Sequence, residues 1–314
     1  MNKILTILKR LVIGIAIMLV ATFAWFYIEY LREVSKLVEL GYRDAGFVID
    51  SHDSISFLAT GDTGSGLPRQ RDIAIQMEKR WRQKKPSGIL LLGDVVYPKG
   101  VTSADDPQWL EKVFSVYTGK CLDTVAIYPV LGNHDYKGNT SSWIEVAKLN
   151  DRWKFPSRHY SIEIPDLLTV YAIDSHYPFN IKSHGIPDFG KSTTPWTIAI
   201  GHHPLQSASA GGGGHRGKSF KGYILRRTLC NRVDAYLSGH SHHLEYNRIH
   251  RCEMDHYISG AGGGTLQELE KNHNALFAAA EYGFLELEVS PKAIKGQFFS
   301  RTGQLIFQTS TIKQ

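Results

Sequence analysis

The stretch VAIYPVLGNHD, residues 125–135, decides the fold, because a short apolar run ends there in a glycine and polar side chains. The pattern recurs four more times, with apolar runs that end at Gly61-Asp62, Gly93-Asp94, Gly201-His202 and Gly239-His240. Short apolar runs bounded by turn residues are typical of buried β-strands. We therefore predict an α/β protein in which five strands end at polar side chains.

The segments between and after these strands complete the expected architecture. Two stretches of mixed charge, 68–84 and 107–117, are predicted to be helices. From residue 283 onward, apolar residues alternate as in strands, with a turn near Thr302-Gly303. Three prolines in the segment 175–195 exclude a long helix there. We expect parallel strands with additional antiparallel pairing.

The polar side chains at the strand ends suggest a metal site. Ligands of α/β sheets bind beyond the carboxyl ends of the strands, and we expect one such edge to carry Asp62, Asp94, Asn133, His202, His240 and His242. Carboxylates, imidazoles and an amide oxygen suit iron, zinc or manganese. So many ligands exceed the needs of one ion with an open position, and they suit two ions about 3.5–4 Å apart that share a carboxylate. The residues thus predict a dinuclear hydrolase.

Five motif blocks, taken in order, resemble those of the calcineurin-like metallophosphoesterases. They are Gly61-Asp62-x-Gly64, Gly93-Asp94-x-x-Tyr97, Gly132-Asn133-His134-Asp135, Gly201-His202-x-Pro204 and Gly239-His240-x-His242. The tyrosine three positions after the second aspartate is similar to that of the purple acid phosphatase branch, particularly the tartrate-resistant acid phosphatase type. The resemblance covers residues 53–308 and implies a β-sandwich flanked by helices.

This resemblance also implies which residue binds which ion. It assigns Fe(III) to Asp62, Tyr97 and His242, a divalent ion to Asn133, His202 and His240, and a bridging role to Asp94. A phenolate is a hard, strongly donating ligand that suits Fe(III), whereas neutral Asn and His suit a divalent iron, zinc or manganese ion. Without the neighbouring Asp94, Tyr97 could instead be a side chain that packs in the core.

The implied activity is that of an acid phosphatase-like hydrolase acting on a small anionic phosphate ester. A metal-activated hydroxide would attack the phosphomonoester, and His134 would assist the leaving alcohol, with Asp135 orienting its ring. Phosphodiesterase, nucleotide pyrophosphatase and protein phosphatase activities are alternatives on the same core. A membrane-anchored binding protein that has lost catalysis is a further alternative.

The glycine-rich stretch GGGGHRGKS, residues 211–219, matches the phosphate-binding loop of nucleotide-binding proteins from Gly212 onward. Such a loop directly follows its strand, but here the strand ends near Ile200 and His202 already occupies its end. The resemblance instead implies a further histidine at the mouth of the cleft. We expect His215 to fill that role on a mobile loop, and a solvated loop without function is the alternative.

The N-terminal segment predicts a transmembrane helix. Residues 11–28 carry no charge and would form a helix about 27 Å long, enough to span a bilayer core. Basic residues precede the segment and mixed charges follow it, which places the N-terminus in the cytoplasm and the rest outside. A cleaved signal peptide, with a secreted product, is the alternative. The expected domains are an anchor and linker, 1–45, and a catalytic domain, 46–314.

Composition adds weaker expectations. A net charge of +6, from 36 basic and 30 acidic residues, favours anionic ligands or a membrane surface, and we expect no nucleic-acid partner. Three cysteines make no disulfide framework. A bridge between Cys230 and Cys252 and three free buried thiols both remain open. The sequence does not indicate the oligomeric state.

Overall fold

The structure is a computed structural model that describes residues 2–39, 46–50, 53–177, 192–211, 216–217 and 219–313. It divides into two compact units, Met1–Arg43 and Asp44–Gln314. The first unit contains the helix α1 (Asn2–Glu39), and the second contains every other described element.

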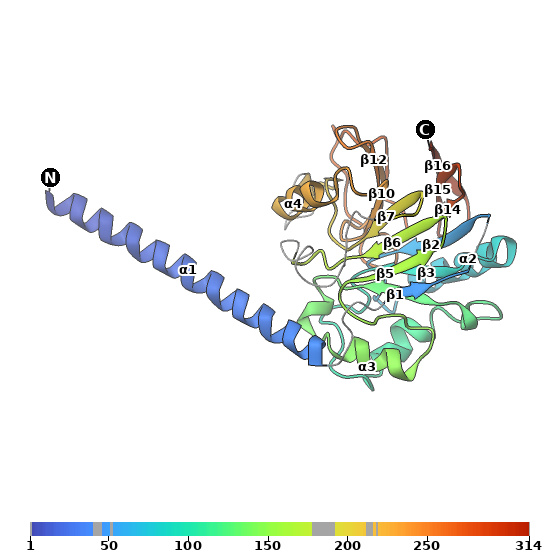
Figure 1. The fold of residues 1–314 in the computed structure, drawn as a ribbon, viewed down its shortest axis with the longest axis horizontal. Coiled ribbons are helices and arrows are strands. Elements are labelled where there is room, and N and C mark those ends of the chain that lie inside the picture. Colours follow the sequence, from blue (N-terminus) through green and yellow to red (C-terminus); the bar gives the residue numbers. More distant parts are fainter. Residues whose placement is uncertain are drawn as a thin grey trace. The chain divides into compact units, whose positions relative to one another are not determined.

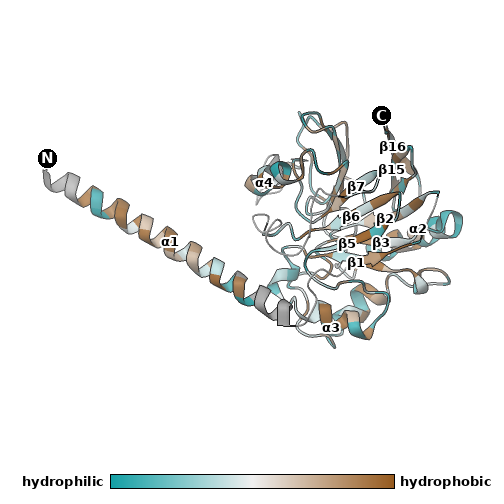
Figure 2. Ribbon diagram, viewed as in Figure 1, coloured by the Kyte–Doolittle hydropathy of each residue, from teal (hydrophilic) through white to brown (hydrophobic). Residues whose placement is uncertain are grey.

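Helix α1 holds one stretch, Ile7–Glu29, that is long and apolar enough to cross a membrane. Figure 2 shows these apolar residues in brown along the middle of the helix. A signal sequence at the N-terminus meets the same criterion of length and composition. The helix therefore agrees with either an anchor or a cleaved leader.

The larger unit is built on two β-sheets, and most of their strands are labelled in Figure 1. In spatial order the eight-stranded sheet contains β1 (Gly46–Val48), β5 (Tyr160–Ile164), β6 (Leu168–Ala172), β7 (Trp196–Ile200), β10 (Ala235–Ser238), β12 (Met254–Ser259), β11 (Leu244–Ile249) and β13 (Phe277–Ala279). Its central strands β6, β7, β10 and β12 are parallel, and β11 and β13 continue the sheet in antiparallel fashion.

The second sheet has six strands. In spatial order they are β16 (Leu305–Ile312), β15 (Ala293–Ser300), β14 (Gly283–Val289), β2 (Ile55–Thr60), β3 (Gly88–Leu92) and β4 (Ile127–Val130). Strands β2, β3 and β4 are parallel, whereas β14, β15 and β16 pair in antiparallel fashion. The antiparallel strands predicted after residue 283 are therefore confirmed, as is the turn at Gly303, whose φ is 86°.

The two sheets pack face to face as a sandwich. Ser259 joins them, because its hydroxyl donates to the Ala59 carbonyl (2.9 Å) and its own carbonyl accepts from the Gly61 N–H (2.7 Å). The rings of Tyr257 and Phe298 meet between the sheets with centroids 6.3 Å apart. The predicted β-sandwich flanked by helices is thus confirmed.

The helices of the larger unit cover the sandwich. They are α2 (Pro68–Lys84), α3 (Ser142–Leu149) and α4 (Phe220–Leu229). Helix α2 matches the predicted 68–84: it begins with a proline in the first turn, where no N–H is needed, and ends with basic residues. Arg80 binds Glu286 of β14 with two nitrogens at 2.6 and 3.0 Å, which fixes α2 on the six-stranded sheet.

The helix predicted for 107–117 is only partly present. Its regular core is a π-helical segment, Leu110–Phe114, in which the Ser115 N–H donates to the Leu110 carbonyl at 2.9 Å. Two 3-10 turns, Leu122–Thr124 and Asp135–Lys137, follow later in the chain. The segment 175–195, for which we predicted no long helix, lies largely outside the described residues.

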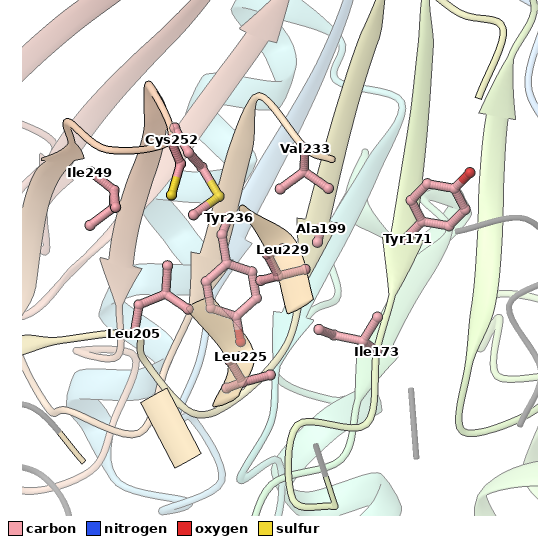
Figure 3. Close-up of a cluster of buried hydrophobic side chains, with 11 residues drawn as sticks. Tyr171, Ile173, Ala199, Leu205, Leu225, Leu229, Val233, Tyr236, Ile249 and Cys252 are labelled. Carbon is pink, nitrogen blue, oxygen red and sulfur yellow. The ribbon is translucent and has the colours of Figure 1, made fainter. Parts of the chain in front are cut away.

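Helix α4 packs on the eight-stranded sheet through an apolar cluster. Figure 3 shows Leu225 and Leu229 of α4 beside Tyr236 and Ala199 of the sheet. A disulfide between Cys230 and Cys252 closes one end of this cluster, with the two Cα atoms 5.1 Å apart. The pairing that the sequence left open is therefore present, and it links the end of α4 to the turn between β11 and β12.

Candidate metal centre

The five polar strand ends come from two sheets. Strands β2, β3 and β4 belong to the six-stranded sheet, whereas β7 and β10 belong to the eight-stranded one. Our expectation of a single sheet edge was therefore wrong, because apolar periodicity does not tell which sheet a strand joins. The carboxyl ends nevertheless meet, since the two sheets face each other across the sandwich.

Three of the strand ends hold a non-glycine residue in a left-handed backbone conformation. The φ angles of Asp62, Asp94 and His240 are 56°, 50° and 66°. Such conformations cost about 1–3 kcal/mol each and persist where the surrounding structure imposes them, often at functional sites. A Cβ at Gly93 would lie 2.5 Å from His202 Nδ1, so glycine is required for this close approach. The backbone is thus shaped around the polar side chains.

One part of the site, the carboxylate–phenol group, consists of Asp62, Tyr97 and His242. The Tyr97 hydroxyl lies 3.0 Å from Asp62 Oδ1 and 3.0 Å from His242 Nε2. His242 Nε2 is also 3.3 Å from Asp62 Oδ1. The three donor atoms therefore converge on one point.

The other part, the imidazole–amide group, consists of Asn133, His202 and His240. Asn133 Oδ1 lies 3.1 Å from His202 Nε2 and 3.0 Å from His240 Nδ1, and the two ring nitrogens are 3.2 Å apart. These three donors converge as closely as those of the first group.

Asp94 lies between the two groups. Its Oδ2 is 3.1 Å from the Tyr97 hydroxyl, and its Oδ1 is 3.5 Å from His202 Nε2. One ligand atom each from Asp62, Asp94 and His202 lies within 4.8 Å of the others. The structure thus brings together all seven side chains that the sequence proposed as metal ligands.

Hydrogen bonds to backbone carbonyls aim two of the imidazoles. A carbonyl only accepts, so His202 Nδ1 donates to Leu92 O (2.8 Å) and His242 Nδ1 donates to Thr265 O (2.7 Å). In the neutral rings the Nε2 lone pairs then face the site. His202 Nε2 faces Asn133 Oδ1, so two acceptors meet without a proton between them. A bound cation satisfies both acceptors, so the residues present fit a metal ion.

The charges of the carboxylate–phenol group are strongly coupled. Burial acts to raise the pKa of Asp62, but the adjacent His242 and their hydrogen bond outweigh it and leave the pKa lowered. Burial acts to lower the pKa of His242, but Asp62 raises it to about 9. Burial and then the charges of Asp62 and Asp94 raise the pKa of Tyr97. A phenolate at this position therefore needs a cation beside it.

Access to the site is asymmetric. Asp62, Asp94, His202 and His240 are buried, whereas the side chains on the open side are half-buried. The half-buried set comprises Tyr97, Asn133, His134 and His242. The metal-binding atoms can therefore be reached by a small molecule from one side.

His134 lies beside the site, but Asp135 does not orient it. His134 Nδ1 donates to the Pro98 carbonyl (2.7 Å), and its ring is 4.7 Å from that of Tyr97. Asp135 is buried and accepts N–H bonds from Gly132 (2.8 Å), Val95 (3.0 Å) and Val96 (3.2 Å). The role that we expected for Asp135 was wrong, because the 3-10 turn directs its carboxylate back to the backbone.

The glycine-rich stretch is only partly described. His215, the expected residue at the cleft mouth, lies outside the described residues, as do residues 212–214 and 218. A short ribbon of β8 (Ser207–Ala208) and β9 (Arg216–Gly217) brackets the gap. Ser219 then caps α4 by accepting from the Gly222 N–H (3.0 Å). No central strand directly precedes the stretch, since β7 ends at Ile200.

Comparison with known proteins identifies the family. A model of the calcineurin-like phosphoesterases matches residues 55–244. The chain belongs to this family. Purple acid phosphatase 3 of Arabidopsis thaliana is 27% identical over 286 residues, covering 81% of this chain and 76% of that protein. Tartrate-resistant acid phosphatase type 5 of Oryctolagus cuniculus is 27% identical over 304 residues, covering 83% of this chain and 92% of that protein.

Solved structures agree on the fold of this calcineurin-like phosphoesterase. A structure titled "GAP50 the anchor in the inner membrane complex of Plasmodium" superposes with a TM-score of 0.72 at 22% identity, over 84% of this chain and 90% of that one. The likeness extends to the fold alone. Because the domain is a phosphoesterase and relatives in sequence are named acid phosphatases, the chain is an enzyme.

Proposed function

We propose that this calcineurin-like phosphoesterase hydrolyses phosphomonoesters at a centre of two metal ions. Fe(III) would bind to the carboxylate–phenol group, and divalent iron, zinc or manganese to the imidazole–amide group. The observation that carries the proposal is the convergence of two different donor sets on the two oxygens of Asp94.

The two donor sets differ in a way that suits two different ions. Asp62 and the phenol of Tyr97 supply hard anionic oxygens, which favour a trivalent ion. Asn133, His202 and His240 supply neutral donors, which favour a divalent ion. Bound together, two such ions neutralise charge on the phosphoryl oxygens and make hydroxide available near neutral pH.

His134 is proposed to serve the leaving group. The bond from its Nδ1 to the Pro98 carbonyl leaves Nε2 as the atom for the substrate. Lys137 lies on the same turn, with its Nζ 3.1 Å from His134 Nδ1 and 3.4 Å from His134 Nε2, and adds a positive charge beside this ring. On the motif resemblance alone, we also propose His215 as a further contact to the ester.

We propose that α1 anchors the enzyme in a membrane, with the N-terminus in the cytoplasm and residues 46–314 outside it. Support comes from the apolar stretch Ile7–Glu29 and from the basic residues that precede it in the sequence. The product of a cleaved leader would be secreted with the same catalytic domain.

Metal analysis and a substrate comparison test the proposal. The full-length protein, purified in detergent, is expected to contain two metal ions per chain, one of them iron, and to show a visible phenolate-to-iron absorption band. It should hydrolyse 4-nitrophenyl phosphate faster than bis(4-nitrophenyl) phosphate. A preference for the diester would favour a phosphodiesterase, and a colourless, iron-free, fully active protein would contradict the iron site. A metal-free protein without activity would favour the alternative of a binding protein.

A further inference from the structure

A cluster of one lysine and two histidines lies next to the imidazole–amide group. We call Lys221, His176 and His203 the lysine cluster. Lys221 Nζ donates to His176 Nδ1 (3.2 Å) and lies 3.3 Å from His203 Nε2. Lys221 comes from the first turn of α4, whereas His203 directly follows the ligand His202. The first turn of α4 thus places an ammonium group beside the candidate metal centre.

The lysine cluster is in ring contact with the metal centre. The His203 ring lies 4.7 Å from the His240 ring and 5.0 Å from the His202 ring. The His176 ring lies 5.5 Å from that of His203. His203 is buried, whereas His176 and Lys221 are half-buried. The outer part of the cluster is therefore partly exposed, whereas His203 lies buried between it and the candidate ligands.

Tyr136 connects this cluster to His134. It lies two positions after His134, and its ring stacks on His176 with centroids 4.6 Å apart and an angle of 20°. Its hydroxyl donates to Asp174, and the guanidinium of Arg158 lies 5.0 Å from the ring centre. Tyr136 is thus held from several sides, and it packs on His176 two positions after the residue that we propose serves the leaving group.

Lys221 feels the negative charge of Asp174 through space, but no carboxylate binds it directly in the part of the chain that the structure describes. No ion pair involves it there, and the two oxygens of Asp174 accept instead from the Tyr136 hydroxyl and the His176 N–H. Burial and the charge of Lys221 lower the pKa of His176 to about 4, so this partner is neutral near pH 7. The direct partners of Lys221 are thus neutral, and a second anion in contact with its ammonium would further stabilise this half-buried cation.

The surroundings of Lys221 add further positive potential. The first turn of α4 contains no acidic residue, and the N-terminus of a helix carries a partial positive charge. Lys221 therefore lies where an acidic side chain would be more favourable for the helix. A cation placed against this preference, in contact with the His203 ring that packs on the candidate ligands, favours an interaction with an anion.

We propose that Lys221 and His176 form an anion site beside the metal centre, which binds a second negatively charged group on the alcohol portion of the phosphoester. The proposal rests on the proposed function and deepens it, because it names the substrate class. The enzyme would prefer monoesters whose alcohol carries a carboxylate or a further phosphate. The reacting phosphate binds at the metal ions, and the ammonium of Lys221 donates to the second anion.

Matched aryl phosphates test this preference. We compare 3- and 4-carboxyphenyl phosphate with 3- and 4-carbamoylphenyl phosphate, which have nearly the same shape without the charge. In the metal-loaded full-length enzyme, kcat/KM is expected to be about tenfold higher for the better carboxylate than for its amide, as for one charge-assisted hydrogen bond. The phenylene bisphosphates extend the comparison from carboxylate to phosphate. Equal kcat/KM for charged and neutral esters would overturn the proposal.

Variants of α4 assign the preference to one residue. Lys221→Met should lose the preference, mainly through KM of the carboxylates, and Lys221→Arg should retain most of it. Arg227→Met removes one charge from the exposed face of the same helix and is the control, expected to leave the ratio unchanged. A ratio that is the same in Lys221→Met and the wild type would overturn the assignment. Thermal unfolding shows whether each variant is folded. The comparison of charged and neutral esters in the wild-type enzyme does not depend on the variants.

A binding measurement separates this proposal from the proposed function. Calorimetry with 4-carboxyphenylphosphonate and 4-carbamoylphenylphosphonate, which are not hydrolysed, measures the anion site directly. If no aryl phosphate is hydrolysed, the proposed function fails, and tighter binding of the carboxylate still supports the anion site. If aryl phosphates are hydrolysed but both phosphonates bind equally to wild type and Lys221→Met, the anion site fails alone.

Discussion

The two groups of the candidate metal centre differ in the chemistry of their donor atoms. The carboxylate–phenol group is held together by its own charges and protons, since Tyr97 and His242 both lie within hydrogen-bond distance of Asp62. The imidazole–amide group contains no carboxylate: Asn133 Oδ1 and His202 Nε2 face each other as two acceptors, and His240 Nδ1 lies 3.0 and 3.2 Å from them. One group carries anionic oxygens, and the other consists of neutral donors.

This difference would allow the two groups, if both bind metal as proposed, to select two different ions. Anionic oxygens stabilise a more highly charged ion, whereas neutral nitrogen and amide donors accept a divalent ion without an excess of negative charge. The hydrogen bonds to the carbonyls of Leu92 and Thr265 orient one imidazole in each group, His202 and His242. Selectivity then depends on the donors, because both groups are equally compact.

Replacing the residue shared by both groups is expected to have the largest effect. Asp94→Asn keeps the size of the side chain but removes its charge and one oxygen acceptor, so both ions should be lost. We expect kcat/KM to fall by at least about a thousandfold, as for a member of a catalytic unit. Metal analysis after dialysis and steady-state kinetics measure this. The exposed Asp151→Asn is the control, and full retention of one ion in Asp94→Asn would contradict the bridging role.

The candidate ligands could be predicted because most of them directly follow a strand. Asp62, His202 and His240 come one or two residues after an apolar run and a glycine, which is visible in the sequence. Tyr97 is different, because it lies five residues beyond β3 and only the motif resemblance indicated it. The assignment of strands to two sheets could not be predicted, since it depends on packing between distant residues.

Other features of the site leave no signal in the sequence. Any residue supplies a backbone carbonyl, so the partners of His202 and His242 could not be identified beforehand. Asp135 was misassigned because its neighbour in the sequence is not its neighbour in space. Lys221 and His176 are 45 residues apart and belong to no motif, so only the fold shows that they meet.

Two variants should each weaken the binding of one ion only, and their effects should be smaller than that of Asp94→Asn. Tyr97→Phe removes the phenol and should abolish the visible band and weaken retention of iron, while the divalent ion stays bound. Asn133→Ala should weaken retention of the divalent ion and keep the band. For each we expect the affinity for the affected ion to fall by at least about tenfold to a hundredfold, the range for the outer partners of metal ligands.

Metal content during titration with a chelator, together with the absorption spectrum, measures both variants side by side. Tyr136→Phe is the control for loss of a phenol near the site, since this ring contacts His176 and not the candidate ligands. If Tyr97→Phe and Asn133→Ala lose the same ion to the same extent, the two groups do not bind separate ions.

The smallest effect is expected where the structure ties the two groups together. Asp135 accepts from Val95 and Val96, which lead to Tyr97, and from Gly132, which precedes Asn133. In Asp135→Asn the amide nitrogen would face one of these N–H groups, so one side of the link is lost. The free energy of unfolding should fall by about 1–3 kcal/mol, and kcat should change less than in the ligand variants. Denaturant unfolding measures the first and steady-state kinetics the second.

Because Asp135 serves both loops and binds no ion, retention of the two metals should weaken equally. Selective loss of one ion would show that Asp135 supports only one group.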